Sequence, residues 1–130
     1  MQSINDLSQE DFEKIAALVC AERDRIKASK EVTVMDQIGE PAFLEQLAEE
    51  CSELSQAALK LARKMRDENP TPKTYQECRD SLQEEMADVL LCIDQYMNEQ
   101  ESDFTVWVYE IKKQKLERWK QRLNEMKSKG

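Results

Sequence analysis

The chain has 130 residues, no histidine, two glycines and three prolines, and its 27 acidic and 19 basic side chains give a net charge of −8. This acidic balance argues against nucleic-acid binding, which normally requires a broad basic surface. No apolar run approaches the length needed to cross a bilayer, and residues 1–12 are too polar for a signal peptide, so we expect a cytoplasmic protein without a membrane partner. The abundance of Glu, Lys, Leu, Gln and Ala predicts one all-α domain over residues 1–130 with four to five helices.

The first predicted helix follows a capping box. Ser8 and Asp11 have the spacing at which each side chain bonds the other's backbone N–H, and Phe12 opens the apolar stripe. Residues 29–40 lose the helical period, so we predict a loop there that ends at Gly39. Pro41 then fits the first turn of the next helix, where its missing N–H costs nothing.

The second long helix is predicted to end near Asp67 and carries an apolar seam with an acidic pair beside it. The seam alternates steps of three and four residues and consists of Leu44, Leu47, Cys51, Leu54, Ala58, Leu61 and Met65. Glu50 precedes Cys51 and Glu53 precedes Leu54. The two carboxylates should therefore stack one turn apart, next to the buried stripe.

A second acidic pair repeats this arrangement on the next helix. The helix follows a break at residues 67–72 and a capping box of Thr74 and Glu77. Its predicted seam consists of Tyr75, Cys78, Leu82, Met86, Val89, Ile93 and Tyr96, and Glu85 and Asp88 precede Met86 and Val89. Residues 89–93 are apolar almost all round, which predicts a helical bundle completed by oligomerisation, as a homodimer or a dimer of dimers.

The last predicted helix, starting at Ser102 or Asp103, is basic. Residues 110–130 contain eight Lys or Arg and three Glu, in contrast to the acidic remainder. Lys112, Lys115 and Arg118 are therefore candidates to contact phosphate oxygens. The alternative is that these cations only complement the dipole of their own helix and keep it soluble.

The four carboxylates Glu50, Glu53, Glu85 and Asp88 are candidate metal ligands. Converging like charges repel and lose solvation, and a divalent cation relieves both costs. An oxygen-only ligand set favours Mg²⁺, with Mn²⁺ as the alternative, and the missing histidine excludes the ferritin-like di-iron pattern. The competing interpretation is that these are solvated carboxylates on the flanks of helices. Cys51, Cys78 and Cys92 lie on or beside the seams, so we expect reduced core cysteines.

These motifs carry a family resemblance over residues 37–123. Glu49-Glu50-Cys51-Ser52-Glu53 matches Glu-Glu-x-x-Glu, and Glu85-Met86-Ala87-Asp88 matches Glu-x-x-Asp. In this order on successive helices they resemble the signature of the MazG-like all-α nucleoside triphosphate pyrophosphohydrolases, and most of all the short phage and prophage members.

The resemblance implies Mg²⁺-dependent hydrolysis of a nucleoside triphosphate to the monophosphate and pyrophosphate, with a house-cleaning role in the nucleotide pool. It implies that Glu50, Glu53, Glu85 and Asp88 bind the metal. Glu49 is the candidate catalytic group that orients water, and Lys112, Lys115 and Arg118 hold phosphates. Two alternatives remain: an enzyme similar to phosphoribosyl-ATP pyrophosphohydrolase, and a catalytically silent helical scaffold.

Overall fold

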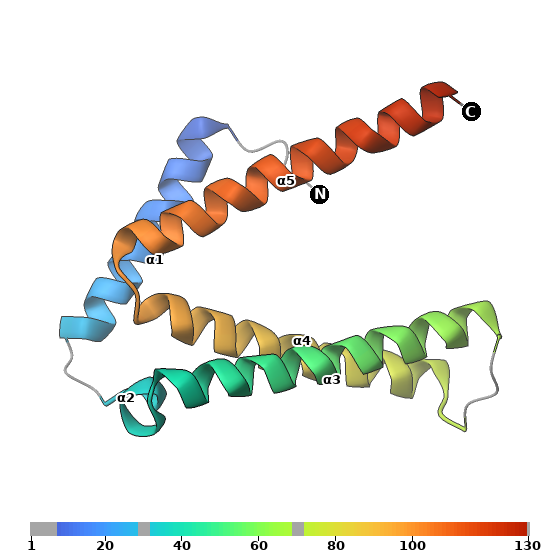
Figure 1. The fold of residues 1–130 in the computed structure, drawn as a ribbon, viewed down its shortest axis with the longest axis horizontal. Coiled ribbons are helices and arrows are strands. Elements are labelled where there is room, and N and C mark those ends of the chain that lie inside the picture. The colour runs from blue at the N-terminus through green and yellow to red at the C-terminus, as the bar shows by residue number, and fades with distance from the viewer. Residues whose placement is uncertain (1–7, 29–31, 69–71, 130) are drawn as a thin grey trace. The chain divides into compact units, whose positions relative to one another are not determined.

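The computed structural model describes residues 8–28, 32–68 and 72–129, and within these ranges the chain is all-helical (Figure 1). The five helices are α1 (Gln9–Ala28), α2 (Val34–Ile38), α3 (Glu40–Arg66), α4 (Tyr75–Asn98) and α5 (Ser102–Lys129). The predicted all-α class is thus confirmed, with five helices and no strand in the described ranges.

The chain divides into two compact units. One unit contains residues 1–31 and 97–130, and therefore α1, α5 and the last residues of α4. The other contains residues 32–96, with α2, α3 and most of α4. The prediction of one MazG-like domain over residues 1–130 stays a prediction.

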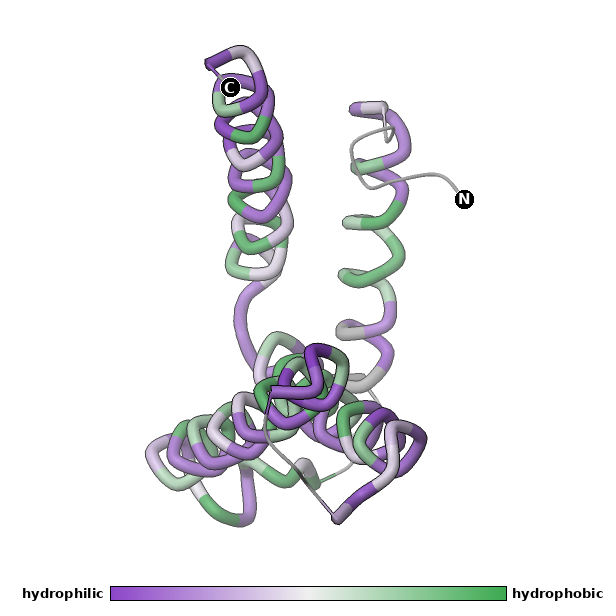
Figure 2. The backbone as a smooth tube through the Cα atoms, turned by 90° about the vertical axis from the view of Figure 1, so that its right-hand side faces the viewer, coloured by the Kyte–Doolittle hydropathy of each residue, from purple (hydrophilic) through white to green (hydrophobic). Residues whose placement is uncertain are grey.

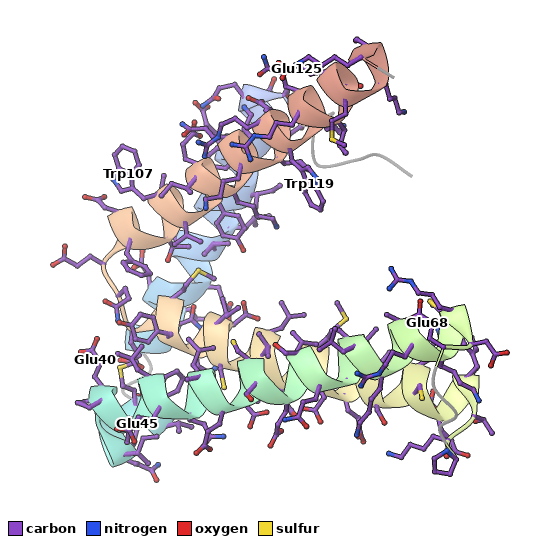
Figure 3. The ribbon with its side chains drawn as sticks, turned by 45° about the vertical axis from the view of Figure 1, so that its right-hand side comes forward. Glu40, Glu45, Glu68, Trp107, Trp119 and Glu125 are labelled. Carbon is purple, nitrogen blue, oxygen red and sulfur yellow. The ribbon has the colours of Figure 1, made fainter. Side chains whose placement is uncertain are left out.

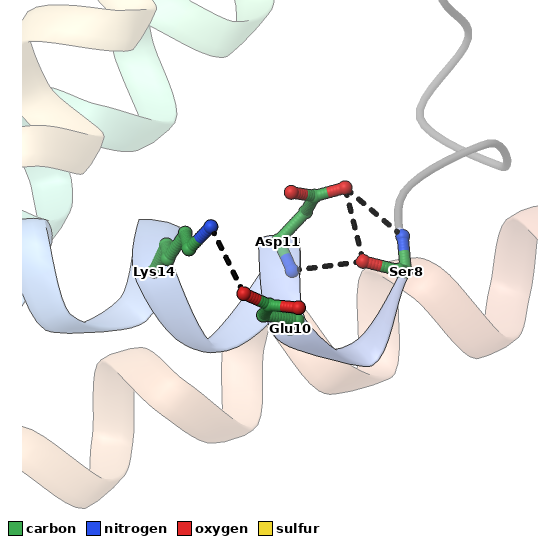
Figure 4. A network of polar contacts seen from close by, with 4 residues as sticks. All are labelled: Ser8, Glu10, Asp11 and Lys14. Atoms are coloured by element: carbon green, nitrogen blue, oxygen red, sulfur yellow. Dashed lines mark hydrogen bonds and ion pairs between the residues drawn. The ribbon is translucent and has the colours of Figure 1, made fainter.

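The capping box predicted before α1 is present (Figure 4). The Asp11 N–H donates to Ser8 Oγ at 3.1 Å, and the Ser8 N–H donates to Asp11 Oδ2 at 3.4 Å. Glu10 and Lys14 form an ion pair of 3.2 Å on the next turn. The backbone N–H groups of Ser8 and Asp11, which have no acceptor in a preceding helical turn, are in this way satisfied.

Helix α2 lies within the predicted loop of residues 29–40, so that prediction was wrong for residues 34–38. Residues 29–31 lie outside the described part of the chain. A capping box that sequence reasoning did not identify starts the helix: the Asp36 N–H donates to Thr33 Oγ1 and the Thr33 N–H donates to Asp36 Oδ2, both at 3.1 Å. These reciprocal bonds allow a helix of only five residues.

Gly39 separates α2 from α3, and the next long helix begins directly after it, as predicted. Its φ of 86° lies where a residue with a Cβ is strained, and its N–H donates to Met35 O at 2.8 Å while its C=O accepts from the Phe43 N–H. Pro41 occupies the first turn of α3, and Asp67 caps the other end in a left-handed conformation. Both predicted boundaries of this helix are confirmed.

Helices α3 and α4 lie side by side and antiparallel (Figure 1). At the start of α3, where Figure 3 labels Glu40, the Tyr96 hydroxyl donates to Glu40 Oε1 at 2.8 Å. The Phe43 and Tyr96 rings pack with their centroids 6.1 Å apart. The hydrogen bond to Glu40, followed by burial and the charge of Glu40, raises the pKa of the Tyr96 hydroxyl. These contacts fix one end of the hairpin.

The inward faces of the two helices differ from the predicted seams. On α3 the buried residues are Phe43, Ala57 and Leu61, whereas the predicted seam residue Cys51 is exposed and Met65 is 61% exposed. On α4 Cys78 and Val89 are buried as predicted, but Met86 is 49% exposed.

Two glutamates occupy the inward positions that were predicted for Cys51 and Met86. Glu50 on α3 and Glu85 on α4 are half-buried. Each glutamate lies at the inward position that was predicted for the apolar residue after it. The reason is that the helix face that carries the buried aromatic and aliphatic residues also includes the glutamate.

In the other unit, α1 contacts α5. Phe12 on α1 is buried, and the Lys113 ammonium lies 5.9 Å from the centroid of its ring. Thr105 is 1% exposed, and its hydroxyl donates to Met97 O at 3.5 Å.

Helix α5 exposes many apolar side chains along its length. Figure 2 shows hydrophobic residues recurring between hydrophilic ones, and Figure 3 shows Trp107 and Trp119 projecting from the helix. Both tryptophans are 64% exposed. Among the described helices, none has both the length and the apolar character that a membrane span requires. Oligomerisation stays a prediction.

Candidate metal centre

Three of the four predicted metal ligands come together on the α3–α4 hairpin. Glu50 and Glu53 lie one turn apart on α3, and Glu85 comes from α4. One carboxylate oxygen from each of the three lies within 4.8 Å of the others. Because these glutamates come from two antiparallel helices, their separation is set by the hairpin and not by one flexible segment. We call Glu50, Glu53 and Glu85 the carboxylate cluster.

Two oxygens of the carboxylate cluster are buried without a hydrogen-bond partner. They are Glu50 Oε2 and Glu85 Oε2. The other oxygen of Glu50 accepts a hydrogen bond of 2.8 Å from Gln46 Nε2. A buried carboxylate oxygen without a donor is costly, and a bound cation removes this cost. The arrangement therefore fits a divalent ion that is coordinated by oxygen.

The electrostatics of Glu85 lead to the same conclusion. Burial raises the pKa of its carboxyl group above the usual range, and the nearby carboxylates of Glu53, Asp88 and Glu50 raise it further. The interaction with the Glu53 side chain also contributes, because it favours the form of Glu85 that carries a proton. A metal ion would compete with that proton, so metal binding at this cluster should weaken as the pH falls.

Cys92 lies beside the carboxylate cluster and was not assigned to it by the sequence. Burial raises the pKa of its thiol, and the charges of Glu50 and Asp88 and the Cys51 thiol add to this effect. The thiol is therefore neutral at physiological pH and is a poor metal ligand, because metals bind the thiolate. The candidate ligands are therefore all oxygens, a donor set that would suit Mg²⁺ or Mn²⁺.

Asp88 and Glu49 lie outside the group of three. Asp88 is exposed one turn after Glu85, and its charge helps to raise the pKa of Glu85. Glu49 is exposed next to Glu50. Their predicted roles, as a fourth ligand and as a group that orients water, stay predictions.

The predicted phosphate contacts lie on α5, in the unit of residues 1–31 and 97–130, whereas the carboxylate cluster lies in the other unit. Lys112, Lys115 and Arg118 are all exposed. Lys112 and Lys115 line an apolar groove of about 420 Å³ with Trp119, and the Lys112 ammonium lies 5.6 Å from the centroid of the Tyr109 ring. Their action on phosphate stays a prediction.

Sequence reasoning missed Gln46, which holds Glu50. The signal was present, because an amide four residues before a carboxylate on a helix is placed to donate to it. Helical spacing could not place the half-buried Cys92 next to the carboxylate cluster, because that proximity depends on how α3 and α4 pair.

Comparisons with family models, curated proteins and solved structures gave no match to this chain.

Proposed function

We propose that the chain is a Mg²⁺-dependent nucleoside triphosphate pyrophosphohydrolase of the MazG-like kind. Its reaction would convert a (deoxy)nucleoside triphosphate and water to the monophosphate and pyrophosphate. One observation carries the proposal: Glu50, Glu53 and Glu85 converge between two helices, with buried and unpartnered oxygens on two of them. The order of the Glu-Glu-x-x-Glu and Glu-x-x-Asp motifs supports it.

In this proposal the carboxylate cluster holds the ion, with Asp88 as a further ligand from the next turn of α4. A bound divalent ion supplies neutralising charge for the phosphates and lowers the pKa of a coordinated water. Glu49 orients the attacking water. The water oxygen forms a bond to the α-phosphorus, its proton is released, and the bond from that phosphorus to the bridging oxygen breaks, so that pyrophosphate leaves. No side chain needs to act as the nucleophile, in agreement with the neutral thiol of Cys92.

We assign Lys112, Lys115 and Arg118 the role of cations that neutralise phosphate oxygens. Their charge and exposure support the assignment.

We also propose that the enzyme is a homodimer or a dimer of dimers. Leu90 and Leu91 in the apolar segment of α4 are 57% and 60% exposed, and Met86 one turn earlier is also exposed. A second copy of the chain would remove this surface from water. Sedimentation equilibrium tests the proposal, since a stable monomer at micromolar concentration would contradict it.

The function is tested by following the products of purified protein with a panel of canonical and modified nucleotides. The reaction is run in ¹⁸O-labelled water, with and without Mg²⁺, and analysed by phosphorus NMR. We expect pyrophosphate and a monophosphate that carries the label. Orthophosphate with a diphosphate product contradicts attack at the α-phosphorus. Turnover of phosphoribosyl-ATP alone would favour that related activity, and no turnover at all would favour a silent scaffold.

A further inference from the structure

A cavity of about 170 Å³ adjoins the carboxylate cluster between α3 and α4. Ala57 and Cys78, which are both buried, form part of its wall. Its volume is about ten times what a single water needs, yet below the roughly 300 Å³ at which pockets for whole small molecules begin. The cavity therefore suits a small polar group, or one part of a larger ligand.

The charged residues around this cavity have both signs. Glu53 and Glu85 are acidic lining residues, and Lys60 and Lys73 are basic ones. Lys60 follows Glu53 by seven residues, which places it on the same face of α3, about 10 Å further along the helix axis. Lys73 lies just before the start of α4. Since the helices are antiparallel, both lysines lie toward the end of the hairpin that connects α3 to α4 (Figure 1).

The two lysines do not neutralise the glutamates directly. Within the ranges that the structure describes, neither Lys60 nor Lys73 forms an ion pair with a carboxylate. Because the lysines and the glutamates line one cavity without forming ion pairs with each other, a ligand can bind between them. That ligand must present a cation to the carboxylates and anionic oxygens to the lysines, which describes a phosphate chain complexed with a divalent ion.

Neutral donors complete the lining. Gln56 on α3 carries an amide and Ser81 on α4 a hydroxyl, and both line the cavity. Neither side chain has a hydrogen-bond partner among the described residues. Amide and hydroxyl donors bind phosphate oxygens without adding charge.

We propose that Lys60 and Lys73 form a pyrophosphate subsite, which binds the two phosphate groups of the metal-bound nucleotide that leave as pyrophosphate. The choice of pyrophosphate rests on the proposed function, whereas the subsite itself rests on the cavity and its charges. The cavity has no room for a whole nucleotide, so the sugar and base lie outside it. Lys60 and Lys73 are thus binding residues of the α3–α4 hairpin itself, distinct from the cations of α5.

The test is calorimetric titration of the full chain with inorganic pyrophosphate in excess Mg²⁺. Each charge-assisted contact that is lost should weaken binding about tenfold or more, so we expect this effect in Lys60→Ala and in Lys73→Ala. The matched control is Arg63→Ala, which removes an exposed positive charge from α3 that does not line the cavity. Because Lys60 and Lys73 are exposed, their substitution leaves the core intact, and circular dichroism verifies this.

The outcomes separate the subsite from the function. Unchanged pyrophosphate affinity in both lysine variants, or no binding by the parent, overturns the subsite even if the parent hydrolyses nucleotides. Lysine-dependent pyrophosphate binding by a protein that hydrolyses no nucleotide supports the subsite and rejects the proposed function. An equal loss of affinity in Arg63→Ala would show a diffuse charge effect and would also overturn the subsite.

Discussion

The α3–α4 hairpin and helix α5 both carry charged side chains at helical spacing, but only the hairpin brings them together. Its three glutamates come from two helices and place their oxygens within 4.8 Å of one another. On α5, Lys112 and Lys115 instead border an apolar groove of their own helix. Helical spacing alone thus distributes charge along a surface, whereas convergence requires a second helix that faces the first.

The two regions also differ in the solvation free energy that their charged groups lose on folding. Two oxygens of the carboxylate cluster are buried and unpartnered, and the pKa of Glu85 is raised. The exposed lysines of α5 keep their solvation. Buried polar groups without a partner and carboxyl groups with a perturbed pKa cluster at functional sites.

The largest expected effect is on turnover. Glu53→Gln or Asp88→Asn should lower kcat by about two orders of magnitude or more, because losing a ligand removes both water activation and charge neutralisation. Lys115→Ala or Arg118→Ala on α5 should have a smaller effect and mainly raise KM. Steady-state assays of pyrophosphate release measure both constants.

The control for this prediction is Glu45→Gln, which removes an exposed carboxylate of α3 (Figure 3) that does not belong to the carboxylate cluster. It should keep the parent kcat. If Asp88→Asn also kept it, the metal site would consist of the three clustered glutamates alone.

Much of the secondary structure could be predicted from local signals in the sequence. The Ser8 and Thr74 caps are present, the latter with the Glu77 N–H donating to Thr74 Oγ1 at 3.1 Å, and α3 begins and ends where Pro41 and Asp67 indicate. Helix α2 was missed although Thr33 and Asp36 have capping-box spacing, because a five-residue helix has no periodic stripe.

The candidate site could be predicted only in part, for a different physical reason. The seams were traced through apolar residues alone, so Glu50 and Glu85 were placed beside the inward faces that they in fact occupy. The cavity bordered by Lys60 and Lys73 depends on which turn of α4 lies opposite which turn of α3. That pairing is a tertiary property, and no spacing within one helix encodes it.

The next effect concerns the affinity for metal. Gln46→Ala removes the amide that holds Glu50, and loss of such a supporting group typically weakens metal binding by about tenfold or more. Calorimetric titration with Mn²⁺ measures the change. Gln76→Ala is a matched control, because Gln76 makes the same bond to Asp80 on α4 outside the carboxylate cluster. Equal Mn²⁺ affinity in the parent, Gln46→Ala and Glu50→Gln would mean that the ion binds elsewhere.

A smaller effect, on thermal stability, should have opposite signs without and with metal. The folded-state pKa of Glu85 is raised, so the folded state binds more protons than the unfolded state between the usual carboxyl pKa of 4.5 and the raised value. Stability therefore falls as the pH rises through this window. Without metal at pH 7, Glu85→Gln should melt a few degrees above the parent, and this difference should shrink as the pH is lowered.

With Mn²⁺ present the order should reverse, since the ion stabilises the parent by about 2.7 kcal/mol at a hundredfold excess over its Kd and binds the variant less well. Scanning fluorimetry at several pH values measures both parts. The control Glu84→Gln removes an exposed charge from the neighbouring position of α4 and should show neither effect. A lower melting temperature for metal-free Glu85→Gln at pH 7 would contradict the assigned repulsion.

The smallest expected effect is on folding stability, and it tests whether the start of α4 can be weakened without changing the carboxylate cluster. Thr74→Ala removes the hydroxyl that accepts the Glu77 N–H at the start of α4, which should cost about 1 kcal/mol of unfolding free energy. Thr74→Ser keeps an acceptor and should restore most of this loss. Denaturant unfolding measures the difference. Because Thr74 lies three turns before Glu85, neither variant should change the Mn²⁺ affinity of the folded protein. A loss of both stability and Mn²⁺ affinity in Thr74→Ala would instead show that the geometry of the carboxylate cluster depends on the first turn of α4. Folding of that turn and metal binding would then be coupled through the whole hairpin.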